Sequence, residues 1–126
     1  MDDVPVEGET ETYTRTFTDE DVEQFSDLSG DRGSHHEAAA GNDRMVHGLL
    51  TATLPTKIGG DMDYIARTMR FEFHRPVYVG EEITCESTVE AFESHETRHE
   101  MAASFVCRSE DEEIVLDGQT EGVIFR

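Results

Sequence analysis

Segments that alternate apolar and polar residues most strongly limit what this chain can fold into. This two-residue period runs through residues 68–73, 83–89 and 98–108, and residues 114–125 supply a further segment. Residues 10–17 alternate in the same way near the start of the chain. Because successive side chains of a strand point to opposite faces, each predicted strand has one apolar face to bury. The pattern therefore predicts a mostly antiparallel sheet.

One segment breaks this pattern because it is apolar nearly all round. Residues 45–54 are too long for an average strand and favour a buried helix, which Pro55 should kink or end because proline lacks a backbone N–H. A shorter helix is predicted from Thr18, a good N-cap followed by three acidic residues, to Gly30. A sheet that must bury one face beside one buried helix suggests an α+β fold in which the sheet curls around that helix.

The charge balance limits the partners of the chain. Its 126 residues, enough for one domain, carry 29 acidic and 10 basic side chains, and the formal net charge of −19 should repel nucleic acid. Such a surplus is a solubility device in concentrated salt, and every basic residue except Lys57 is Arg, so we favour a halophilic protein. An acidic protein of an ordinary cytoplasm is the alternative.

Three further features are typical of a cytoplasmic protein. Residues 1–9 are interpreted as a flexible acidic arm, without the apolar stretch of a leader. No segment approaches the roughly 18 apolar residues that span a bilayer, so no membrane partner is expected. Cys85 and Cys107 lie in alternating segments, which favours buried, reduced thiols over a disulfide or a metal site.

The polar loop after the short helix contains the strongest candidates for chemistry. Asp31 and His36 lie five residues apart in a loop that contains Gly33, so their side chains could meet at one point. A carboxylate and a neutral imidazole that share a water can take and deliver its proton, as addition of water to a double bond requires. An Asp that follows Gly at a helix end is also a common turn former, and both interpretations stay open.

His47 and Gly48 lie at or near the first turn of the predicted buried helix. Exposed amides there, at the positive end of the helix dipole, could bind the negative charge that develops on a thioester oxygen. One well-placed donor of this kind contributes about 3 kcal/mol to transition-state stabilisation. Close packing of the helix against the sheet explains Gly48 equally well.

Three ordered motifs resemble those of the MaoC-like (R)-specific enoyl-CoA hydratases. They are Ser29-Gly30-Asp31 with His36, the segment 45–50 that contains His47-Gly48, and residues 73–83, which read Phe-His-Arg-Pro-Val-Tyr-Val-Gly-Glu-Glu-Ile. The resemblance implies a single hot-dog domain over residues 1–126, usually paired as a homodimer or a dimer-based oligomer. It also implies (R)-specific hydration of trans-2-enoyl-CoA to (R)-3-hydroxyacyl-CoA, or the reverse dehydration.

The same resemblance implies roles for single residues. Asp31 would be the general base, and His36 would share the water and deliver a proton to the alpha carbon. The Gly48 amide would bind the thioester oxygen, with His47 and Ser29 in the substrate-binding set. Coenzyme A would arrive as part of the substrate, so no separate cofactor is expected. No metal is expected either, because the adjacent residues 35–37 lack the usual spacing of chelating ligands.

The chain departs from the family pattern inside this loop, where Gly33, Ser34 and His35 replace Asn, Pro and an apolar residue. Glycine has more backbone freedom to lose on ordering than proline, so the loop should be looser. Two other functions are therefore kept: a hot-dog thioesterase, in which water attacks the carbonyl, and a non-catalytic acyl-CoA-binding protein. Residues 45–54 contain no acidic side chain, which counts against a thioesterase with its carboxylate on the central helix.

Overall fold

A computed structural model describes residues 4–38 and 44–126 of the chain. Its main element is an antiparallel five-stranded sheet in the order β1-β5-β6-β7-β3. The five strands match the alternating segments of the sequence, which confirms that prediction. They are β1 (Thr10–Thr16), β3 (Ile65–Phe73), β5 (Glu82–Ser94), β6 (Arg98–Ser109) and β7 (Ile114–Phe125), with a separate two-stranded pair of β2 (Met45–Val46) and β4 (Val77–Tyr78).

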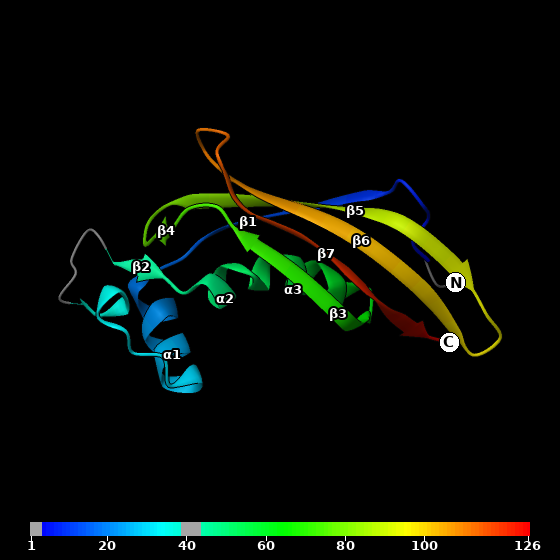
Figure 1. Cartoon of the computed structure of the whole chain (residues 1–126), viewed down its shortest axis with the longest axis horizontal. Coiled ribbons are helices and arrows are strands. Elements are labelled where there is room, and N and C mark those ends of the chain that lie inside the picture. The colour runs from blue at the N-terminus through cyan, green and yellow to red at the C-terminus, as the bar shows by residue number, and fades with distance from the viewer. Residues whose placement is uncertain (1–3, 39–43) are drawn as a thin grey trace.

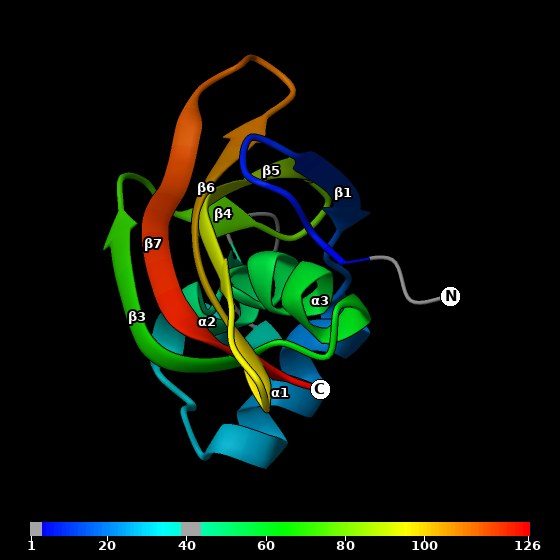
Figure 2. The ribbon, with the colours of Figure 1, turned by 90° about the vertical axis from the view of Figure 1, so that its right-hand side faces the viewer.

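The sheet curls around a helix that is nearly continuous. This helix comprises α2 (Gly48–Thr51) and α3 (Thr53–Asp61), and Figures 1 and 2 show α3 in the concave face of the sheet. Leu54 from the helix shares one buried core with Ile83, Phe105 and Leu116 from the strands. The predicted α+β arrangement, a curled sheet around a central buried helix, is therefore confirmed.

The central helix begins later than predicted and runs past Pro55. Met45 and Val46, predicted as helical, form β2, and the helix continues beyond Pro55 as far as Asp61. A break at Ala52 makes Pro55 the third residue of a new helical segment. Amides in the first turn of a helix have no intrahelical acceptor, so proline fits there without losing a hydrogen bond. Pro55 was expected to kink or end the helix; the interruption lies three residues earlier, at Ala52, and the helix does not end at Pro55.

Helix α1 (Asp19–Ser29) packs at one end of the sheet and has the capping signals expected from the sequence. Thr18 Oγ1 accepts a hydrogen bond from the Asp21 N–H at 3.1 Å, and the Asp21 carboxylate accepts one from the Thr18 N–H at 2.9 Å. At the other end Gly30 adopts φ 79°, a left-handed conformation that favours glycine, and its N–H donates to Ser26 O. Gly30 thus ends the helix and turns the chain into the loop of Asp31.

Part of the predicted acidic arm runs beside the sheet. Pro5 is buried, the Gly8 N–H donates to Val89 O at 2.8 Å, and the Val89 N–H donates to Glu9 O at 2.9 Å. Residues 1–3 of the arm lie outside the described residues. Within the described residues, no helix is both long and apolar enough to cross a membrane.

Cys85 and Cys107 are free thiols buried in the core, as predicted. They are direct partners in the register between β5 and β6. A hydrogen bond with Cys85, together with burial, raises the pKa of Cys107, so this side chain remains a protonated thiol.

Candidate active site

Asp31 lies on a tight turn just beyond α1. Ser29 Oγ donates to Phe25 O at 2.7 Å and accepts a hydrogen bond from the Asp31 N–H at 3.1 Å. One carboxylate oxygen, Asp31 Oδ1, accepts from the Gly33 N–H at 3.2 Å, while the side chain remains 56% exposed. These bonds hold the main chain and Oδ1 of Asp31, and they leave Oδ2 available for chemistry.

His36 lies in a single 3-10 turn, η1 (Ser34–His36), and only 5% of it is exposed. Its Nδ1 lies 2.8 Å from Met45 O, and because a carbonyl oxygen can only accept, Nδ1 must carry the proton. The Nε2 of the neutral ring is then a hydrogen-bond acceptor. Arg44, which is buried, donates from Nε to His36 O at 2.9 Å and holds the backbone of the turn.

The two side chains that the sequence singled out come together. His36 Nε2 lies 3.7 Å from Asp31 Oδ2, which is too long for a direct hydrogen bond but close enough for one water beside both atoms to bind to each. Both atoms are acceptors when Asp31 is ionised and His36 is neutral. A water between them could donate one hydrogen bond to each, so the geometry suits activation of water by two paired bases.

The turn also favours the ionised form of Asp31. The Gly33 N–H that donates to the carboxylate holds the pKa of Asp31 below its ordinary value of 3.8, against an opposing contribution from partial desolvation. Nearby His36, His47 and His35 lower the pKa further. Because this carboxyl loses its charge only as the pH falls through the depressed pKa, Asp31 remains a competent base above that value.

A carboxyl titration can test this assignment. We expect the Asp31 side-chain carbon, followed by 13C NMR while the pH is lowered, to have its midpoint below 3.8. An unfolded peptide with the sequence of the loop provides the reference, because it lacks the fixed Gly33 donor. A midpoint in the folded protein at or above that of the peptide would contradict the hydrogen bond.

Two of the three other predicted site residues lie close to the pair without facing the pocket. His47 is 2% exposed, and its ring stacks on the His36 ring with centroids 3.7 Å apart and 18° between the planes. Ser29 shapes the turn of Asp31 through its bonds to the main chain. Neither belongs to the residues that line the pocket beside His36.

That pocket has a volume of about 370 Å³ and lies between the loop, α2 and the sheet. Gly48 and Thr51 line it from the helix, and Phe73 and Val115 line it from β3 and β7. A Cβ added at Gly48 would lie only 2.9 Å from Cε1 of Phe73, so the absence of a side chain lets this ring pack over the helix start. The Gly48 N–H is at the first helical position, where amides have no intrahelical acceptor. The pocket therefore brings together the imidazole of His36 and a potential oxyanion donor.

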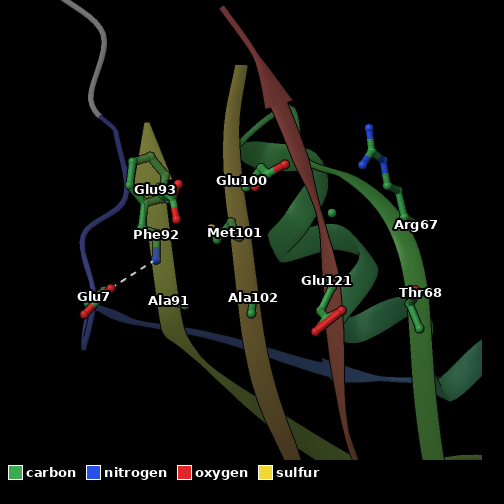
Figure 3. A pocket seen from close by; sticks show the side chains of 11 residues that line it. Glu7, Arg67, Thr68, Ala91, Phe92, Glu93, Glu100, Met101, Ala102 and Glu121 are labelled. Atoms are coloured by element: carbon green, nitrogen blue, oxygen red, sulfur yellow. Dashed lines mark hydrogen bonds between the residues drawn. The ribbon is translucent and has the colours of Figure 1, made fainter. Parts of the chain in front are cut away.

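A second groove, of about 440 Å³, lies on the face of the sheet away from α3 (Figure 3). His36 lines the first pocket but not this groove, and Asp31 lines neither of them. Its charged lining consists of one arginine and four glutamates, Arg67, Glu7, Glu93, Glu100 and Glu121. Carboxylates this dense would repel the phosphates of a coenzyme A thioester. The pocket beside His36 is the better candidate for such a substrate.

Asp31, His36 and His47 also place possible metal-ligand atoms within 4.8 Å of one another. The two rings do not suit a shared ion, because His36 Nδ1 and His47 Nε2 already bind main-chain carbonyls. Their other nitrogens belong to stacked, nearly parallel rings, so the in-plane lone pairs do not converge on one point. This arrangement fits proton transfer better than metal binding.

Two residues that support the site had no recognisable signal in the sequence. Arg44 is 4% exposed and also binds the Asp19 carboxylate at 3.1 Å, although an arginine in a polar loop is normally expected in solvent. Ser26 is buried and contacts His47 from α1. Only the tertiary contacts between α1 and the loop reveal these roles.

Comparison with known proteins identifies the family. A family model described as the FAS1-like dehydratase domain region matches residues 8–116. The chain belongs to the MaoC-like dehydratase family. A 3-hydroxybutyryl-CoA dehydratase of Methylorubrum extorquens is 32% identical over 124 residues, covering 89% of this chain and 76% of that protein. A mitochondrial 3-hydroxyacyl-[acyl-carrier-protein] dehydratase of Solanum lycopersicum is 28% identical over 127 residues, covering 93% and 76% respectively.

A solved structure confirms the hot-dog fold of this MaoC-like chain. The (R)-hydratase from A. caviae involved in PHA biosynthesis superimposes with a TM-score of 0.81 at 23% sequence identity. The match covers 97% of this chain and 98% of the hydratase. Fold and family therefore agree with the resemblance seen in the sequence, and the family is one of hydratases and dehydratases, which are lyases.

Proposed function

We propose that this MaoC-like protein catalyses the reversible syn hydration of a trans-2-enoyl-CoA to a (R)-3-hydroxyacyl-CoA. The observation that supports this most directly is the 3.7 Å separation of Asp31 Oδ2 and His36 Nε2 beside the 370 Å³ pocket. The dehydratase names of the two curated relatives support the same class of reaction.

In the hydration direction, one water molecule supplies both groups that are added. Asp31, as the general base, removes one proton while the water oxygen attacks the beta carbon of the enoyl thioester. The electrons of the double bond move toward the thioester oxygen, where the Gly48 N–H stabilises the enolate-like charge. The proton that Asp31 has taken passes to Nε2 of His36, which delivers it to the alpha carbon, so both side chains regain their starting protonation states. The atoms balance, because one hydrogen of water stays on the new hydroxyl group and the other ends on the alpha carbon.

The choice of coenzyme A over an acyl carrier protein rests on charge. Carrier proteins are acidic and require basic side chains around the pocket, whereas the net charge of this chain is −19. Arg75, which lines the pocket, is engaged by Glu81 through two hydrogen bonds of 3.1 and 3.0 Å. Arg32, beside Asp31, pairs with Glu23 and Asp27. A coenzyme A thioester presents fewer charges to this surface than a whole acidic protein.

A spectroscopic assay tests this function. Enzyme added to trans-2-enoyl-CoA of several chain lengths, in low and in high salt, should remove the absorbance of the conjugated thioester and yield the (R) product. The same acyl groups on a carrier protein should react more slowly. Release of free thiol without hydration would indicate a thioesterase, and unchanged absorbance at every chain length would contradict the proposal.

We also propose that two copies of the chain pair through β3. This strand lies at the edge of the sheet, and its large apolar residues Ile65, Met69 and Phe73 are exposed. Met69 and Phe73 are four residues apart and share one face of the strand. The register shift between Ala66 and Thr68 places Ile65 on the other face. Exposed apolar side chains on an edge strand favour association with another chain. Because Phe73 packs against Gly48, such an interface would adjoin the pocket.

The proposed dimer can be tested by introducing one charged side chain on the exposed apolar face of β3. Wild-type protein should sediment as a dimer, and Met69→Glu should sediment as a monomer because the interface would bury an unpaired carboxylate. Leu28→Glu is the matched control, since Leu28 is an exposed apolar residue on α1. A monomeric wild type, or a dimer that Met69→Glu leaves intact, would rule out this interface.

A further inference from the structure

We infer that His47 is a positioning residue for the catalytic pair, a role that rests on the proposed hydratase function. Its side chain is only 2% exposed and lies stacked on His36, so it is not accessible to the substrate. Any effect of His47 on the reaction must pass through Asp31 and His36, whose atoms it contacts.

The contacts of His47 define its tautomer. Nε2 lies 3.0 Å from Asp31 O and 3.2 Å from Ser26 Oγ. A carbonyl oxygen can only accept, so Nε2 carries the proton, and Ser26 Oγ accepts from the same N–H. Nδ1 is buried and has no hydrogen-bond partner among the described residues. The neutral ring with its proton on Nε2 is therefore the form that fits these contacts.

This ring joins the separate segments that carry the reacting groups. Its Nε2–H binds the main chain of Asp31, and its face stacks on His36. Phe25 of α1 packs against the same ring, with centroids 4.8 Å apart and 55° between the planes. His47 also directly precedes Gly48, the proposed donor to the thioester oxygen. One buried side chain thus fixes the relative positions of the base, the imidazole and the oxyanion donor.

The bond from His47 also explains how a loop without proline can hold its geometry. Gly33 and Ser34 occupy the positions where the family pattern has Asn and Pro, so the loop has little rigidity of its own. The His47 bond restrains the main chain at Asp31, and the stack restrains the ring of His36. These contacts from behind the loop add to the hydrogen bonds within it, such as that from the Gly33 N–H to the Asp31 carboxylate.

Three substitutions separate the hydrogen bond from the stack. In His47→Gln the amide nitrogen can reach the position of Nε2, whereas in His47→Asn it reaches only that of Nδ1. His47→Phe keeps a ring but has no donor. Because a misplacement of about 1 Å can cost about 10² in rate, we expect His47→Asn and His47→Phe to lower kcat by about 10- to 100-fold with little change in KM. His47→Gln should retain a clearly larger share of kcat.

Wild type and Asp31→Asn are assayed first on the same enoyl-CoA. An inactive wild type would contradict the hydratase function and this role with it. If the wild type is active and depends on Asp31, equal kcat values for His47→Gln and His47→Asn at similar thermal stability would overturn the positioning role alone. Should His47→Asn unfold, the comparison of His47→Gln with His47→Phe decides, and equal kcat values for these two would again overturn it.

Discussion

Asp31→Asn is expected to lower kcat for enoyl-CoA hydration by about 10² to 10⁴, the usual contribution of a positioned acid or base. Asparagine has nearly the same shape as aspartate, and its Oδ1 can still accept the Gly33 N–H that shapes the turn. The substitution therefore removes the proposed base while it retains the loop. Initial rates of absorbance loss, over a range of substrate concentrations, should show the effect in kcat rather than in KM.

Asp27→Asn is the matched control for this variant. Asp27 lies on α1, is mostly exposed and pairs with Arg32, so the substitution removes one negative charge near the loop without touching the pocket. Its kcat should equal that of the wild type. Full activity in Asp31→Asn, or the same loss in both variants, would show that Asp31 is not the base.

His36→Ala should lower kcat by a similar factor of about 10² to 10⁴, because it removes the proposed donor of the proton to the alpha carbon. The variant should also be less stable, since Met45 O loses the donor on the buried ring. Added imidazole should restore part of the rate by entering the space that the side chain vacates beside the pocket. His95→Ala, at the distant hairpin between β5 and β6, is the control that removes a histidine elsewhere.

The double variant provides a further test of the pair. Groups that act as one unit are strongly non-additive, so Asp31→Asn combined with His36→Ala should be about as slow as the slower single variant. Multiplied losses would mean that the two side chains act in independent steps. Unchanged activity in His36→Ala alone would remove His36 from the mechanism.

Much of the fold could be predicted because its signals are local. The alternation in β6 puts Met101, Ala103 and Phe105 on one buried face, as the sequence indicated. The sequence also predicted that α1 begins after Thr18 and ends at Gly30. Pro55 was expected to kink or end the helix, whereas the break lies at Ala52, a position without a sequence signal of its own.

The candidate site was only partly readable for a different reason. Asp31 and His36 are five residues apart in one loop, so the sequence alone could indicate that their side chains lie close together. His47 was expected among the substrate-binding residues because it precedes Gly48, yet its partners Ser26 and Asp31 come from another part of the chain. Contacts of this kind depend on how α1 packs against the loop, which no spacing in the sequence reveals.

The central claim is tested most directly by a crystal structure of the Asp31→Asn variant with trans-2-enoyl-CoA bound. The account predicts a thioester oxygen within hydrogen-bonding distance of the Gly48 N–H, and a beta carbon that faces a water between residue 31 and His36. A thioester bound in the groove on the outer face of the sheet, or side chains at positions 31 and 36 that point apart, would contradict it.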